Sequence, residues 1–139
     1  MPESKYNWNQ ADFLKANEIS LYVNRAIAKR AEKVSQIQFA LKRGDKEITK
    51  DPRLDLLYRP NKLFTGAQFW KLYQTYLDVT GEAYIWMVRG GELFSGGKVS
   101  ELHLLRPHLM QHVYNDQTGM IEKFIYGPNR VEYRPEDII

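Results

Sequence analysis

The 139-residue sequence predicts an α+β fold in which two main helices precede a mostly antiparallel sheet of several short strands. Apolar residues recur every three or four positions within residues 19–34 and again within 69–77, which is the period of an amphipathic helix. After Gly81 the period changes to two, and short apolar segments alternate with turns. Because closely spaced strands joined by short turns pair antiparallel, this order indicates the α+β class.

The amino-terminal third is predicted to hold a flexible arm, a helix and a hairpin. Residues 1–16 are polar and show no sustained period, so we expect an arm there, followed by one domain over residues 17–139. The first helix is predicted to start at the N-cap Asn17, and its apolar stripe continues to Val34. Period-two alternation over 37–41, a turn around Gly44 and a short returning segment at 47–49 predict the hairpin.

The second main helix has clear start and stop signals. Asp51-Pro52 predicts the start of a short helix that Pro60 ends. Thr65 and Gln68 match a capping box, so the second main helix is expected to begin there. Gly81 suits the left-handed position that ends it. Five strands are then predicted at 83–88, 99–105, 109–114, 120–126 and 131–133, with Pro107 between the second and the third.

Composition excludes several classes of protein. Hydrophobic residues make up 43% of the chain and charged residues 27%, which is typical of a folded domain. Cysteine is absent, which excludes disulfides, thiol nucleophiles, iron–sulfur clusters and cysteine-based zinc sites. Apolar runs are much shorter than the about 20 residues that a bilayer span needs, so no membrane partner is predicted.

The net charge of +3 is unevenly distributed along the chain. Residues 1–24 sum to −1 (2 basic, 3 acidic), residues 25–62 to +6 (11 basic, 5 acidic) and residues 63–139 to −2 (7 basic, 9 acidic). One interpretation of the basic block is a solvated helix face and a polar hairpin. The other is a surface that meets DNA, RNA or an acidic partner. Both remain open from charge alone.

No group of residues predicts catalysis or a cofactor. His103, His108 and His112 have a spacing that suggests metal ligands, but Pro107 separates them, so exposed polar positions are favoured and no metal site is predicted. Gly96-Gly97-Lys98-Val99 lacks the remaining glycine and the hydroxyl residue of a phosphate loop, and a hairpin loop is favoured. Glu82 suits either a buried acid or, more plainly, a hydrogen-bonding role at its turn.

Five segments in a fixed order carry a resemblance to a known family. They are Val23–Val34 leading into 37–41, Leu56–Asn61 followed by Thr65–Trp70, Thr80–Tyr84, Leu102–Pro107, and Tyr133–Ile139. In this order they resemble the amino-terminal part of the portal proteins of tailed bacteriophages and prophages. Its motif positions fall on Asn61, Thr65, Phe69, Trp70, Gly81, Glu82, Ala83, Tyr84 and Pro107.

Two departures from the family pattern are visible. Glu82 stands where the family usually has asparagine, which changes the charge of that turn. The last segment normally continues with a histidine, which would follow Ile139. We therefore expect the 139 residues to be a fragment of a longer chain.

The resemblance implies a structural role without catalysis. It implies a subunit of a portal ring, commonly of twelve copies, at one capsid vertex of the virion. DNA is packaged through such a ring and ejected through it. The implied partners are the terminase, the major capsid protein and the head–tail adaptor, with double-stranded DNA passing through the channel. Assembly would take place in the bacterial host cytoplasm, and no cofactor is implied.

The resemblance also implies which part of the subunit this is. The amino-terminal region forms most of the outer wing, so the basic residues are expected to face a neighbouring subunit or the capsid rather than DNA. The residues concerned are Arg25, Lys29, Arg30 and Lys33.

Two alternatives belong to other functional classes. The first is a small nucleic-acid-binding α+β module that uses the basic block at 25–62, and binding that falls steeply with salt would favour it. The second is a metal-dependent enzyme built on the three histidines, which stoichiometric metal after dialysis would favour.

Overall fold

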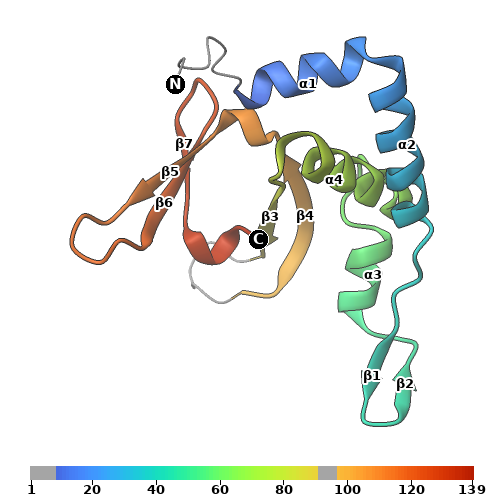
Figure 1. Cartoon of the computed structure of the whole chain (residues 1–139). Coiled ribbons are helices and arrows are strands. Elements are labelled where there is room, and N and C mark those ends of the chain that lie inside the picture. Colours follow the sequence, from blue (N-terminus) through green and yellow to red (C-terminus); the bar gives the residue numbers. More distant parts are fainter. Residues whose placement is uncertain (1–8, 91–96) are drawn as a thin grey trace, which may run out of the picture.

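A computed structural model describes residues 9–90 and 97–139 and confirms the α+β class. Its strands form three small antiparallel sheets. In Figure 1, α2, α3 and the β1–β2 hairpin lie at the right, β3 and β4 in the middle, and β5, β6 and β7 at the left. The order is α1 (Gln10–Ile19), α2 (Leu21–Ser35), β1 (Leu41–Arg43), β2 (Lys46–Ile48), α3 (Pro52–Tyr58), α4 (Gly66–Thr80), β3 (Tyr84–Arg89), β4 (Val99–Leu105), η1 (Pro107–Leu109), β5 (Met110–Tyr114), β6 (Ile121–Tyr126), β7 (Val131–Tyr133) and η2 (Pro135–Asp137). Within the described ranges, no helix combines the length and apolar character of a membrane span.

The predicted helix start at Asn17 is wrong. Asn17 lies inside α1, and α2 begins after Ser20, whose hydroxyl accepts a hydrogen bond from the backbone of Val23. The predicted arm is therefore helical from residue 10 onward. Asn9 and Asp12 begin this helix by exchanging hydrogen bonds between side chain and backbone at 3.0 and 3.1 Å. Helix α1 has no sustained apolar stripe, and it is held by its polar cap and by contacts with α4. The spacing of apolar residues therefore does not predict this helix.

The strand predicted over 37–41 is also wrong for most of its length. Only Leu41 belongs to β1, which pairs with β2 through the turn at Gly44, where φ is +61°. The backbone of Phe39 is held instead by the Tyr58 hydroxyl, which accepts from its N–H at 2.9 Å and donates to its C=O at 3.1 Å. A side chain from α3 thus satisfies the groups that a strand partner would otherwise pair.

Helix α4 begins and ends as predicted. The Thr65 hydroxyl accepts from the Gln68 backbone, and the Gln68 side chain accepts from the Thr65 backbone at 3.0 Å. Gly81 ends the helix with φ of +78°. Gly66 is required at the first turn for a different reason: a Cβ there would lie 2.6 Å from the carbonyl oxygen of Tyr58. Glycine therefore permits the close approach of α4 to the end of α3.

The β3–β4 sheet forms a central layer between the helices and the second sheet. Its two strands pair antiparallel with Tyr84 opposite Leu105. One face carries Ile85 and Leu102, which pack on Phe69 of α4. The other face carries Tyr84 and Leu105, which pack on Phe124 of β6.

Two further sheets complete the structure. Strands β5, β6 and β7 form a three-stranded antiparallel sheet, and the β1–β2 hairpin stands apart from both others. In Figure 1 the hairpin projects away from the body beyond α3, while the β5–β6 tip projects on the opposite side. The predicted strands are thus divided among three sheets.

Candidate interaction surfaces

The last described residues of the chain bind the outer edge of β3. The N–H and C=O of Ile85 exchange hydrogen bonds with Ile139 at 2.8 and 2.9 Å, and Ile138 bridges to Trp86. On the opposite edge of this sheet, the Leu102 N–H donates to the Pro60 carbonyl at 2.8 Å. Both edges of the β3–β4 sheet are therefore covered at the centre by non-neighbouring parts of the chain, which leaves less exposed backbone for unwanted pairing.

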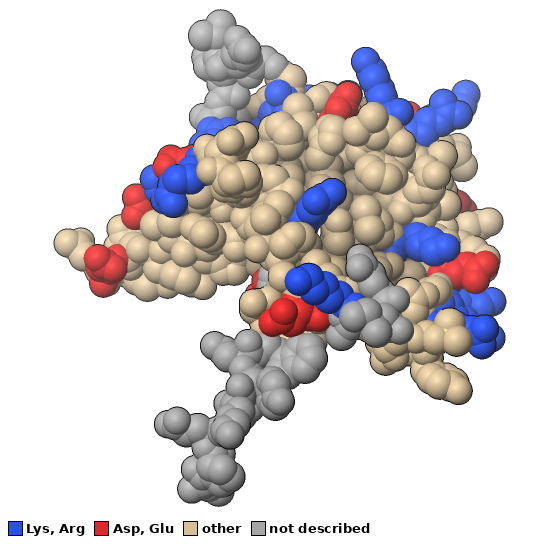
Figure 2. Space-filling view, turned by 90° about the horizontal axis from the view of Figure 1, so that it is seen from above, with Lys and Arg blue, Asp and Glu red and all other residues tan. Residues whose placement is uncertain are grey.

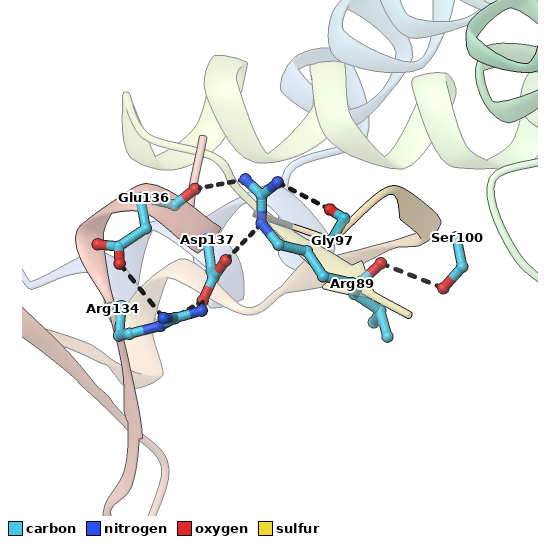
Figure 3. A network of polar contacts seen from close by, with 7 residues as sticks. Arg89, Gly97, Ser100, Arg134, Glu136 and Asp137 are labelled. Carbon is cyan, nitrogen blue, oxygen red and sulfur yellow. Dashed lines mark hydrogen bonds and ion pairs between the residues drawn. The ribbon is translucent and has the colours of Figure 1, made fainter. Parts of the chain in front are cut away.

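A polar network at the carboxyl-terminal end of β3 fixes this arrangement (Figure 3). The Arg89 guanidinium donates to Asp137 Oδ1 at 2.9 Å, to the Glu136 carbonyl at 3.1 Å and to the Gly97 carbonyl at 3.2 Å. Asp137 also accepts from Arg134, whose Nη2 lies 2.8 Å from Asp137 Oδ2. One buried carboxylate is thus shared by two arginines that come from β3 and from the segment before η2.

Two opposing effects act on the pKa of Asp137. Burial favours the neutral form and raises the pKa, whereas the hydrogen bonds and charges of Arg89 and Arg134 lower it. The second effect prevails, and the pKa of Asp137 is held below its ordinary value. Since the folded state has the lower pKa, the carboxylate stabilises the fold fully above about pH 4, the ordinary aspartate pKa, and this contribution is lost as the pH falls through the folded-state value.

Replacing the carboxylate by an amide tests this network. We expect Asp137→Asn to lower the free energy of unfolding by about 1–3 kcal/mol at pH 7, because hydrogen bonds to a charged acceptor are lost. In urea unfolding curves recorded from pH 7 to pH 2, the difference between the two proteins should shrink below about pH 4. The matched control is Glu136→Gln, because Glu136 lies 3.5 Å from Arg134 with 58% of its side chain exposed, and we expect no measurable change. A difference that stays constant down to pH 2 would contradict the assignment.

The departure at Glu82 has a visible structural consequence. Glu82 is exposed, so it is not a buried acid, and its carboxylate accepts a hydrogen bond from the Tyr84 hydroxyl at 2.8 Å. Burial, together with this carboxylate, raises the pKa of Tyr84. The same hydroxyl lies 2.7 Å from His112 Nε2, and His112 Nδ1 lies 3.4 Å from the Tyr114 hydroxyl. Because the Tyr84 proton points at Glu82, its oxygen accepts from His112 Nε2–H.

The three histidines have separate environments. His103 on β4 pairs with Glu101 at 2.8 Å, His108 in η1 is exposed, and His112 belongs to the Tyr84 hydrogen-bond chain. In residues 9–90 and 97–139, no cluster of three or more His, Asp or Glu side chains has the geometry of a metal site. Of the Gly96-Gly97-Lys98-Val99 segment, Gly96 lies outside the described residues, and the Gly97 carbonyl accepts a hydrogen bond from Arg89.

The motif positions of the sequence mark structural junctions. Asn61 joins two segments: its Nδ2 donates to the Leu102 carbonyl at 2.7 Å, and its Oδ1 accepts from the backbones of Leu63 and Phe64 at 2.8 and 2.9 Å. Trp70 Nε1 donates to the Leu57 carbonyl at 2.8 Å. Phe69, Tyr84 and Pro107 are buried, Ala83 is half-buried, Thr65 and Gly81 are the caps of α4, and Glu82 holds Tyr84.

The predicted contact residues on α2 are all exposed: Arg25, Lys29, Arg30 and Lys33. Arg30 pairs with Asp78 of α4 at 3.2 Å, so it also links the two helices. That these residues contact a partner stays a prediction. The apolar stripe of α2 is less buried than its period suggests, since Ala31 is fully buried whereas Leu21, Tyr22 and Val23 are 59%, 84% and 48% exposed. Sequence periodicity could not reveal this, because a partner outside the chain produces the same pattern as a core.

The chain is similar to known proteins in sequence and in fold. A family model described as "Phage portal protein" matches residues 22–139. A chain in the structure "Neck of empty GTA particle computed with C6 symmetry" is similar over 93% of this chain, with 19% identity and a TM-score of 0.75. A chain in "Virion of native gene transfer agent (GTA) particle" is similar over 93%, with 20% identity and a TM-score of 0.72.

A third structure, "Neck of native GTA particle computed with C12 symmetry", contains a chain that is similar over 95% of this one, with 20% identity and a TM-score of 0.66. The present chain spans about a third of each of those chains, namely 35%, 34% and 35%. The search of curated proteins gave no significant match.

Proposed function

The chain belongs to the phage portal protein family, and from this we propose that it is the wing region of a structural subunit of the portal ring at the capsid vertex. DNA is packaged and ejected through that ring. The observation that carries the proposal is the family match over residues 22–139. The similarity in fold to chains of particle necks supports it.

The symmetry of the similar structures supports a closed ring. Those necks were computed with C6 and C12 symmetry, which fits a ring of twelve copies. In such a ring the wing would contact neighbouring subunits and the capsid, while the terminase and the head–tail adaptor would bind the assembled particle vertex. The subunit would act within the virion after assembly in the host cytoplasm.

A structural role without catalysis fits the polar groups that the structure describes. The buried Asp137 carboxylate is held by two arginines, and Tyr84 and His112 hydrogen-bond each other. Each group is used to join elements of the fold. A depression of about 310 Å³ lies beside Asn61 and Phe64 and is open to solvent.

The mass of the assembled full-length protein tests the proposal. We expect native mass spectrometry to give a closed oligomer, with twelve copies as the main species. A full-length protein that stays monomeric at all concentrations would overturn the proposal. A parallel titration of the 139-residue chain with duplex DNA tests the nucleic-acid-binding alternative. An affinity for DNA that falls steeply as the salt concentration rises would favour that alternative.

A further inference from the structure

We propose that neighbouring copies of this chain meet head to tail, with the basic side of one copy against the acidic tip of the next. The basic side is defined as α2 together with the β1–β2 hairpin. The acidic tip is defined as the turn and strand ends between Tyr114 and Glu122. This inference rests on the proposed ring and names the surfaces that close it.

The basic side combines positive charge with uncovered apolar residues. It contains most of the block that sums to +6, and Figure 2 shows basic side chains along the right-hand side, where Figure 1 places α2 and the hairpin. Leu21, Tyr22 and Val23 of α2 are 59%, 84% and 48% exposed there. An exposed apolar patch with a charged rim is typical of a protein interface.

The hairpin itself carries an unfavourable pair. Arg43 and Lys46 lie directly opposite each other in the β1–β2 register, and like charges in this position destabilise a hairpin. The hairpin has only two strands, which makes it marginally stable by itself. An acidic surface placed against it would relieve the repulsion between the two cations.

The acidic tip has the opposite character. Asp116 and Glu122 are exposed and form no ion pair with a described residue. Tyr114 and Met120 beside them are 54% and 70% exposed. In Figure 2 acidic side chains lie at the far left, at the end of the molecule where Figure 1 places the β5–β6 tip.

The positions of the two surfaces favour a head-to-tail contact over a two-fold contact. A closed ring requires two different surfaces on opposite sides of each subunit, and the basic side and the acidic tip are on opposite sides in both views. A two-fold contact between two basic sides would bring like charges together, which opposes association. Opposite charge on opposite sides therefore favours a second copy, oriented head to tail, as the occupant.

Charge reversal provides the test in the full-length protein. One variant reverses charge on the basic side with Lys33→Glu on α2 and Lys46→Glu on β2, and the second reverses the tip with Asp116→Lys and Glu122→Lys. The first places a carboxylate opposite Arg43, so the hairpin itself gains a favourable pair. We expect each variant alone to need at least a tenfold higher concentration to form rings. The matched control is Lys71→Glu, an exposed position on α4 outside both surfaces, which should assemble as the parent does.

Mixing the two variants distinguishes this contact from others. In an alternating ring, each reversed basic side meets a reversed tip and each native basic side meets a native tip, so the equimolar mixture should recover the parent's assembly. A chain that carries both reversals should recover it as well. If the parent forms rings but the single variants assemble equally well, or the mixture does not recover, the inference is overturned and the proposed function stands. If the parent forms no ring, the proposed function fails and the inference fails with it.

Discussion

Replacing Phe69 by alanine is expected to lower the free energy of unfolding by about 3–5 kcal/mol. Its side chain has no exposed surface, and it lies in the cluster that joins α4 to Ile85 of β3 and Leu102 of β4. The ring of Trp70 packs edge-on against it, with centroids 5.1 Å apart. Loss of the phenyl ring would leave a cavity at the point where the helical and sheet layers meet.

Urea unfolding monitored by tryptophan fluorescence measures this effect. The matched control is Leu63→Ala, because Leu63 is 77% exposed and its truncation should change stability by no more than about 0.5 kcal/mol. A loss for Phe69→Ala below about 1 kcal/mol would contradict the described core, because it would mean that the site is already accessible to water.

Asn61→Ala is expected to cost about 2–4 kcal/mol, because one side chain makes three hydrogen bonds to backbone groups of two segments. The amide nitrogen binds the Leu102 carbonyl on β4, and the amide oxygen holds the turn before α4. Asn61→Asp keeps the second role and loses the first, so its cost should be smaller. The measured quantity is again the free energy of unfolding in urea.

The chain offers a matched asparagine for this experiment. Asn115 Oδ1 accepts from the backbones of Gln117 and Thr118 at 2.9 and 3.0 Å, and both of these bonds lie within one turn. Asn115→Ala therefore removes the same kind of turn hydrogen bonds, with no link to β4. We expect it to lower the free energy of unfolding by about 1 kcal/mol. Equal costs at Asn61 and Asn115 would show that the bond to Leu102 contributes nothing.

Local signals predicted three of the helix caps, although the N-cap predicted at Asn17 is wrong. Asp51, Thr65 and Gly81 each act within three or four residues of their own position, and the structure confirms all three. The change from helical to alternating period at Gly81 likewise predicted the α+β class. These features depend on backbone groups that lie nearby in sequence, and so residue types alone are sufficient to find them.

Features that depend on distant partners were not predicted. The segment before β1 is not a strand, because the Tyr58 hydroxyl binds the backbone of Phe39 from nineteen positions away. Arg89 and Asp137 are 48 positions apart, and the nearest signal for their pairing is the Pro-Glu-Asp segment that forms η2. The exposure of Tyr22 could not be predicted for a related reason. The spacing of apolar residues is the same whether they pack in a core or lie on a surface that binds a partner.

The pairing of Ile85 with Ile139 has a consequence for synthesis on the ribosome. Helices α2 and α4 find most of their helical and strand partners among residues already made when Thr80 emerges. The outer edge of β3, by contrast, has no partner at its centre until residue 139 has left the exit tunnel. A nascent chain that pauses earlier displays an open strand edge, which is the kind of surface that recruits chaperones or pairs with a neighbouring nascent chain. Translation speed through the last strands therefore sets how long this edge is exposed.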